Sequence, residues 1–376
     1  MSSDQHRREQ LARTNPLFGP SKLKLGTFCS NTSGGATMSS MEGVFDLSWP
    51  NSLRLAELAE EMKFEAIVPV GRWMGFGGDT DFSGEVFETM AFAAGVTART
   101  SFPSVFATLH VPAMHPVMAC KQATTIDHIG GGRFTLNIVC GWNKREIELF
   151  GSPILEHDTR YDVADEWISL MKLLWTSDAP VDFDGHYFQV KGALMKPRPV
   201  QPYPALMSAG ASPKGRAFAA RHCDIAFAPL AERDPDSIRR RIDSYKQAAF
   251  EQYGRELSIW INAYVFQGDS EADAQRRFDH CVHEKGDWAG VENLIRDMGI
   301  SQQSHTPEML IKLKEDFIAG WAGFRLLGTR ERIVEDMKML VDAGVDGVLL
   351  TFPAFIGDME RFRDEVHPLL VQEGLR

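Results

Sequence analysis

Short apolar runs separated by helix-like segments are the strongest constraint on the fold of this chain. Eight runs follow one another, at residues 23–29, 64–70, 101–109, 134–139, 205–210, 224–229, 257–268 and 347–353. Many of the segments between them repeat apolar residues every three or four positions, which is typical of amphipathic helices. Strands that alternate with helices form parallel sheets, and eight such units close into a barrel. The sequence therefore predicts an α/β fold, a (β/α)8 TIM barrel.

The fourth apolar run contains the most informative polar residue. It follows a glycine triplet at 130–132, which ends the preceding helix because glycine enters the left-handed conformation without steric cost. Asn137 then interrupts a strand that is otherwise apolar, and a buried amide without hydrogen-bond partners is costly. Ligands of TIM barrels bind at the C-terminal ends of the strands. We therefore expect Asn137 to pair with a specific group at a ligand site.

The remaining sequence predicts one domain with additions. A chain of 376 residues with 44% hydrophobic residues can form a single large barrel. Residues 1–21 carry many charges, so we expect a flexible N-terminal arm followed by one domain over residues 22–376. Residues 181–192 alternate around an Asp-Gly turn and predict a β-hairpin insertion. Residues 286–323 break the alternation of strands and helices and predict a second insertion, over the C-terminal strand ends.

Charge and cysteine content exclude several classes of function. The net charge of −11 gives no support to nucleic-acid or membrane-surface binding. The five cysteines are odd in number and contain no CxxC pair, which argues against disulfides and a zinc site and favours a cytoplasmic protein. His110 and His115 have no recognised metal-ligand spacing. His110 follows a strand, so it can instead provide a hydrogen bond to a substrate.

Several motifs together resemble one known family. They are GRWMGFGG at 71–78, FAT at 106–108, NIVCGW at 137–142, TRY at 159–161 and ASPKG at 211–215. The chain resembles the luciferase-like flavin-dependent monooxygenases, which are TIM barrels, and within them the group that contains the pyrimidine monooxygenase RutA and the dimethylsulfone monooxygenases. The GFGG and FAT motifs match the pyrimidine enzymes. Those enzymes have a lysine where this chain has Arg72.

The resemblance implies roles for named residues. It implies that Thr108 and Asn137 place dioxygen beside the flavin, with Trp142 and Phe227 closing the pocket. It also implies that FMN is bound by Gly71, Arg72, Asn137, Glu146, Arg160, Tyr161 and Ser212. From the residues alone, strand propensity explains Thr108 and helix capping explains Ser212 equally well.

The resemblance also implies a reaction. Reduced FMN, supplied by a separate NAD(P)H-dependent flavin reductase, would react with O2 through a flavin N5-peroxide. The attacked group would be an electrophilic carbon, such as an amide carbonyl of a pyrimidine or related N-heterocycle. One alternative is cleavage of a C–S bond in a sulfone or sulfonate, and a second is a non-oxygenating flavin or F420 dehydrogenase. A homodimer or homotetramer without a metal is expected.

Overall fold

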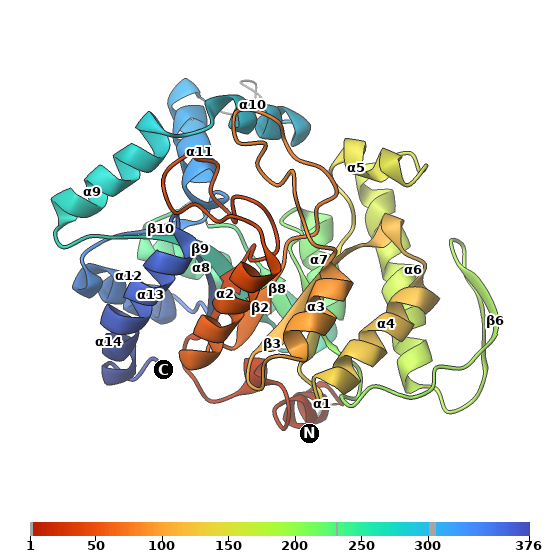
Figure 1. The fold of residues 1–376 in the computed structure, drawn as a ribbon. Coiled ribbons are helices and arrows are strands. Elements are labelled where there is room, and N and C mark those ends of the chain that lie inside the picture. The colour runs from red at the N-terminus through yellow and green to blue at the C-terminus, as the bar shows by residue number, and fades with distance from the viewer. Residues whose placement is uncertain (1–2, 231, 301–305) are drawn as a thin grey trace.

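Parallel strands form a closed barrel at the centre of the molecule (Figure 1). The structure is a computed structural model that describes residues 3–230, 232–300 and 306–376. Strand β11 pairs with β1 and strand β8 pairs with β9, so the ring closes. The fold is the (β/α)8 TIM barrel that the sequence predicted. In order around the ring, the strands are β1 (Lys24–Phe28), β2 (Ala66–Val68), β3 (Ser104–His110), β4 (Phe134–Val139), β7 (Ala205–Ser208), β8 (Ile225–Phe227), β9 (Ser258–Gln267) and β11 (Gly347–Thr351).

Helices surround the barrel, and many of them begin at a capping side chain that accepts a hydrogen bond from the first helical turn. Ser48 caps α2 and Thr329 caps α12 in this way. No helix in the described ranges has both the length and the apolar character that a membrane span requires. The helices are α1 (Ser3–Leu11), α2 (Trp49–Glu61), α3 (Thr89–Thr97), α4 (Pro116–Ile129), α5 (Lys144–Leu149), α6 (His157–Thr176), α7 (Pro213–His222), α8 (Pro235–Tyr253), α9 (Glu271–Asp279), α10 (Trp288–Asp297), α11 (Pro307–Gly320), α12 (Arg330–Asp342), α13 (Phe355–Glu365) and α14 (His367–Gln372).

Large apolar side chains fill the inside of the barrel. Phe106 and Trp260 are almost completely buried there, together with Met207 and Leu349. Burying each such side chain contributes about 1.5–3 kcal/mol, so this layer stabilises the barrel and closes its lower part. Space for a ligand therefore remains only near the C-terminal ends of the strands.

The glycine triplet after α4 sets the position of β4. Gly131 and Gly132 adopt the left-handed conformation, with φ of 59° and 93°. A Cβ atom on Gly132 would lie 2.6 Å from the Thr14 hydroxyl oxygen, so this position also needs glycine for space. The strand that follows pairs in parallel with β3, and Asn137 lies opposite Thr108 in the register. The two side chains that the sequence singled out are thus direct neighbours.

Three additions decorate the barrel. Strands β5 (Val181–Asp184) and β6 (Gln189–Ala193) form an antiparallel hairpin away from the barrel. Helices α10 and α11 lie over one end of the barrel (Figure 1). A ninth strand, β10 (Phe324–Gly328), follows α11 and pairs with the C-terminal half of β9. The sequence analysis did not predict β10.

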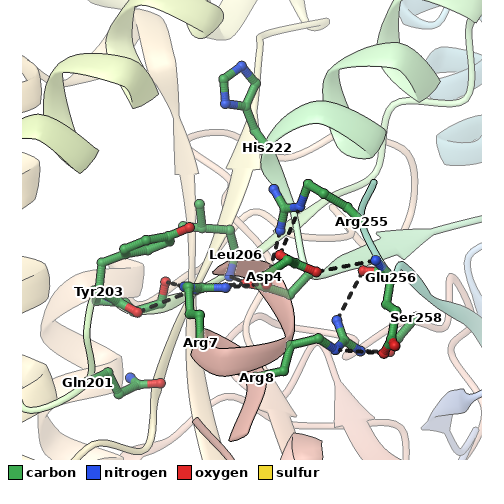
Figure 2. A network of polar contacts seen from close by, with 12 residues as sticks. Asp4, Arg7, Arg8, Gln201, Tyr203, Leu206, His222, Arg255, Glu256 and Ser258 are labelled. Atoms are coloured by element: carbon green, nitrogen blue, oxygen red, sulfur yellow. Dashed lines mark hydrogen bonds and ion pairs between the residues drawn. The ribbon is translucent and has the colours of Figure 1, made fainter. Parts of the chain in front are cut away.

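The N-terminal segment, expected to be a flexible arm, forms helix α1 against the end of the barrel opposite α10 and α11 (Figure 1). Arg7 of α1 is buried and forms a two-pronged ion pair with Asp224, at the start of β8. Arg255 contacts both Asp224 and Asp4, each at 3.2 Å. Figure 2 shows Asp4, Arg7 and Arg8 pointing from α1 into this network. Although burial raises the pKa of Asp224, the charges of Arg7 and Arg255 lower it to about 2.

Replacement of Arg7 by alanine is expected to lower the free energy of unfolding by about 3 kcal/mol, because it leaves the buried Asp224 carboxylate with one cation fewer. The neighbouring residue Arg8 provides the control. Its partly exposed side chain bonds Glu256 O and Ser258 Oγ at 3.1 and 3.2 Å, and Arg8→Ala should cost less than about 1 kcal/mol. Urea unfolding measures both values. Equal losses for the two variants would contradict the assignment of Arg7 as the main anchor of α1.

Candidate active site at the C-terminal end of the barrel

A cavity of about 110 Å³ lies at the C-terminal ends of the barrel strands, and we call it the central pocket. Seven of the eleven residues to which the sequence analysis gave a role line it: Gly71, Arg72, Thr108, His110, Asn137, Trp142 and Phe227. The remaining lining residues are Phe28, Val70, Val139, Met207, Ala209, Trp321 and Leu349. Most of these are apolar, so the pocket combines a few polar groups with an apolar wall, as ligand sites commonly do.

Thr108 and Asn137 form a hydrogen-bonded pair in this pocket. The Thr108 hydroxyl donates to the carbonyl oxygen of Pro69 at 2.6 Å. The same hydroxyl oxygen accepts a hydrogen bond from Asn137 Nδ2 at 3.1 Å. The resemblance implied that these two side chains act together on dioxygen. In the structure the Thr108 hydrogen is already donated to Pro69 O, so the hydroxyl orients Asn137.

The orientation of the Asn137 amide follows from these contacts. Pro69 O can only accept, so Thr108 must donate to it and can only accept from Asn137. The amide nitrogen therefore faces Thr108, and Oδ1 faces away from it. Oδ1 is buried and has no hydrogen-bond partner within the described part of the protein. An unpartnered buried acceptor costs roughly 1–3 kcal/mol, so it marks a place where a ligand donor is missing.

Arg72 and Glu146 form a buried ion pair beside the pocket. Arg72 Nη2 lies 2.5 Å from Glu146 Oε2, and both side chains are almost completely buried. The other Glu146 oxygen accepts from the Trp73 backbone N–H at 2.8 Å. Burial lowers the pKa of Arg72 and raises that of Glu146. Both carboxylate oxygens are occupied, and Glu146 lines a narrow cavity that shares His110 and Trp142 with the central pocket.

The Arg72 guanidinium also faces two aromatic rings. Its central carbon lies 4.7 Å from the Trp142 ring centre and 5.5 Å from that of Phe76. A guanidinium over an aromatic face is attracted by the ring quadrupole. Arg72 Nη1 nevertheless has no hydrogen-bond partner among the described residues. The side chain is therefore held rigidly and still has donor capacity at the central pocket.

At Gly71 the backbone passes so close to Thr108 and His110 that a side chain would not fit. A Cβ atom on Gly71 would lie 2.8 Å from Thr108 O and 3.1 Å from His110 Cε1. Burial, with the charge of Arg72, lowers the pKa of His110 to about 3. The imidazole is therefore neutral at physiological pH, and one nitrogen can donate while the other accepts. His110 follows Thr108 by two positions, so the two-residue period of a strand places both on the same face.

The pH dependence of stability provides a test of the His110 environment. The folded state keeps His110 neutral down to about pH 3, whereas an unfolded chain protonates it below about pH 6.5. Stability is thus lost as the pH falls below about 6.5, by about 2 kcal/mol at pH 5. We expect His110→Gln to reduce the fall in unfolding free energy between pH 8 and pH 5 by this amount. Parallel curves for the variant and the wild type in urea unfolding would contradict it.

A second cavity, the side pocket, has a volume of about 210 Å³ and is lined by Arg160, Cys140, Val111 and other residues. Arg160 Nη1 donates to Gly141 O, and its buried Nε has no partner in the part of the chain that is described. A narrow cavity lined by His110, Pro112, Trp142 and Ile147, among others, shares residues with both pockets.

The side chains of Tyr161 and Ser212 are hydrogen-bond partners. The structure places Ser212 at the N-cap of α7, where its Oγ accepts from Gly215 N at 3.1 Å. The Tyr161 hydroxyl lies against Gly210 and Gly215, where an added Cβ would be 2.6 Å away. Helix α6, which carries Arg160 and Tyr161, is capped by Glu156. Asp158 lies in the first turn of this helix.

The structure thus separates the residues that the resemblance assigned to the site. Gly71, Arg72, Thr108, Asn137, Trp142 and Phe227 line the central pocket, and Arg160 lines the side pocket. Glu146 lines the narrow cavity, whereas Tyr161 and Ser212 line none of these three. Trp321 was missed, because it belongs to the irregular segment after α11 and no local pattern places it at the pocket. Phe28, Met207 and Leu349 were also missed, although their positions near the ends of predicted strands could have identified them.

Comparisons with known proteins agree with this geometry. The family model described as luciferase-like monooxygenase matches residues 23–347. An FMNH(2)-dependent dimethylsulfone monooxygenase of Pseudomonas putida is 29% identical over 93% of this chain and 95% of its own. A pyrimidine monooxygenase RutA of a Bradyrhizobium species is 27% identical over 94% of this chain and 99% of its own.

Solved structures show the same fold. Riboflavin lyase, solved with modified FMN and riboflavin, superposes with a TM-score of 0.82 at 19% identity, over 94% of this chain and 92% of its own. The EDTA monooxygenase of a Chelativorans species gives a TM-score of 0.79 at 24% identity, over 94% of each chain. Because the family model spans most of the sequence, the chain belongs to the luciferase-like monooxygenase family.

Proposed function

We propose that this protein is an FMNH2- and O2-dependent monooxygenase that attacks an amide-type carbonyl of a pyrimidine or related N-heterocycle. The observation that carries the proposal is the pair of unused polar atoms at the central pocket, the Arg72 Nη1 donor and the Asn137 Oδ1 acceptor. A pyrimidine edge, like the pyrimidine part of a flavin, presents a carbonyl acceptor beside an N–H donor. The RutA relatives support the same substrate class.

The two pockets provide for the two ends of FMN. Each is smaller than the roughly 300–1,000 Å³ typical of ligand sites, so the cofactor must extend over both. The central pocket suits the edge of the ring, because most of its wall is apolar. The side pocket suits the phosphate, because the planar guanidinium of Arg160 matches phosphate oxygens. Ser212 and Tyr161 add hydroxyl groups near Arg160.

The protein side chains then have distinct tasks. Reduced FMN supplies the electrons that activate O2. Asn137 orients the reacting groups through its amide, and Thr108 fixes that amide by accepting from Nδ2. Trp142 and Phe227 exclude water from the pocket, which strengthens each polar contact inside it. Glu146 holds Arg72 in place. A separate NAD(P)H-dependent reductase delivers the reduced flavin, since no GxGxxG motif follows the first strand.

A second candidate is cleavage of a C–S bond in a sulfone or sulfonate. It is favoured by the dimethylsulfone monooxygenase relative. The unused Arg72 donor suits a sulfone oxygen as well as a carbonyl oxygen, whereas the Asn137 Oδ1 acceptor has no partner on a sulfone. Because of this difference, we favour a pyrimidine over a sulfone as the substrate.

A substrate panel tests the proposal. The enzyme is mixed anaerobically with reduced FMN and uracil, thymine or dimethyl sulfone, and air is then added. We expect the ultraviolet band of a pyrimidine to disappear only when reduced FMN, O2 and enzyme are all present. Loss of no pyrimidine in the panel would reject this substrate class, and release of methanesulfinate from dimethyl sulfone would establish the second candidate.

A further inference from the structure

A fourth cavity, which we call the outer pocket, lies beside the central pocket and has a volume of about 450 Å³. It is formed by the segment after β8, by α11 and by β10. Its wall is largely apolar and includes Leu230, Met298, Met309, Leu313 and Phe324. Met298 and Met309 are 41% and 55% exposed, so a large apolar surface is open to solvent. Flexible methionine side chains adapt readily to an apolar ligand.

In the outer pocket the acidic side chains have ion-pair partners, whereas two of the basic side chains have none in the described part of the chain. Its carboxylates are both bound to arginines, since Glu232 accepts from Arg241 at 2.6 Å and Asp316 accepts from Arg325 at 2.8 Å. Arg233 and Lys312 line the same pocket and form no ion pair with any described residue. Arg233 instead lies over the Phe324 ring, 5.6 Å from its centre.

The acidic groups near Arg233 include Glu232, whose buried Oε2 has no hydrogen-bond partner among the described residues, and Asp336. The charge of Arg233 helps to lower the pKa of Asp336, which burial raises more strongly. The Asp336 carboxylate, however, is bound by Arg332 at 2.8 Å. The outer pocket therefore has an excess of positive charge on a protein whose net charge is −11. Such a local excess attracts anions.

A strained turn separates the outer pocket from the central pocket. Trp321 lines the central pocket, and Ala322 and Gly323 line the outer one. Trp321 and Ala322 adopt the left-handed conformation, with φ of 53° and 51°, which is costly for residues other than glycine. Asn262 Nδ2 holds the turn by donating to Trp321 O at 3.1 Å. This geometry keeps the indole between the two cavities.

We propose that the outer pocket binds a small amphipathic anion, with an apolar body against the methionine and leucine side chains and one carboxylate or sulfonate head between Arg233 and Lys312. The volume accommodates a chain of about eight carbons or a bicyclic aromatic ring. Binding here does not require the flavin, and it is independent of the proposed oxygenation.

Calorimetry with octanoate and 1-octanol as probes tests the proposal on the full-length protein saturated with oxidised FMN. We expect octanoate to bind and 1-octanol to bind at least about tenfold more weakly, because only the acid carries the charge. Reversing both charges with Arg233→Glu and Lys312→Glu should weaken octanoate at least about tenfold. The matched control reverses the exposed Lys22 and Arg99, and should change octanoate binding by less than about twofold.

Three outcomes would overturn the proposal. They are equal binding of octanoate and 1-octanol, unchanged octanoate binding in the Arg233→Glu/Lys312→Glu variant, and octanoate binding to the FMN-free protein that is absent from the FMN-saturated protein. The last result would place the anion in the flavin pockets. Flavin fluorescence provides the complementary readout, because the charge-reversed variant should bind FMN as the wild type does. Weaker FMN binding would instead assign Arg233 and Lys312 to the flavin phosphate.

Discussion

Replacing Asn137 with alanine is expected to lower turnover in oxygenation by about 10²–10³-fold, the loss that follows removal of one preorganised hydrogen-bonding group at a reacting centre. The side chain is fixed by Thr108 and presents its unpartnered Oδ1 at the central pocket. Nothing in its contacts connects it to the side pocket. FMN affinity should therefore change by less than about threefold.

The Arg160→Ala variant provides the contrast for Asn137→Ala. Arg160 lines the side pocket and has an unused donor, so its loss removes a charge-assisted contact with phosphate. FMN affinity should fall at least about tenfold, whereas turnover at saturating flavin should stay near the wild-type value. Flavin fluorescence titration measures the affinity, and oxygen consumption with substrate measures turnover. Equal loss of FMN binding in the two variants would contradict this division of roles.

The Arg72–Glu146 pair should produce the largest change in stability. Each side chain is almost completely buried, so Arg72→Met leaves an unpaired carboxylate and Glu146→Leu leaves an unpaired guanidinium. Each single change should lower the free energy of unfolding by about 3–5 kcal/mol. The double variant Arg72→Met/Glu146→Leu leaves neither charge, and it should unfold within about 2 kcal/mol of the wild type. Urea unfolding of the wild type, the two single variants and the double variant measures the coupling between the two charges.

FMN binding separates the two roles of Arg72 in the same variants. If Arg72 contacts the flavin, Arg72→Met and the double variant should both lose affinity, although the double variant regains stability. The Glu146→Leu variant keeps the Arg72 guanidinium but removes its ion-pair partner, so its FMN affinity should fall less. If the double variant lost as much unfolding free energy as the two single variants together, the two charges would not depend on each other. Wild-type FMN affinity in the double variant would limit Arg72 to a structural role.

The sequence was sufficient for the barrel because its signals are local. Each of the eight strands is a short apolar run ended by glycine, polar residues or a helix cap, and the eight runs correspond to the ring strands. Strand β10 could not be predicted in this way. Its partner is the far half of β9, some sixty residues earlier in the chain, and Arg325 and Leu327 give it no continuous apolar character.

Helix α1 could not be predicted for the same reason, because its contacts are with residues that are distant in the sequence. Its residues are mostly polar, which locally indicates an exposed segment, but Arg7 is buried and forms an ion pair with a residue 217 positions away. In the pocket, the identities of Thr108 and Asn137 were available from sequence, whereas the direction of their hydrogen bonds was not. That direction depends on Pro69 O, which belongs to a different strand end. The outer pocket likewise depends on segments that are far apart in the sequence.

The central claim is that reduced FMN and O2 react at the central pocket, beside Asn137. A single-turnover experiment with ¹⁸O2 tests it most directly. The enzyme with reduced FMN and the pyrimidine that the panel identifies is mixed with ¹⁸O2, and the product is analysed by mass spectrometry. The account predicts one ¹⁸O atom in the product of the wild type, and a product yield reduced in proportion to turnover with Asn137→Ala. Product without ¹⁸O, or full yield from Asn137→Ala, would contradict it.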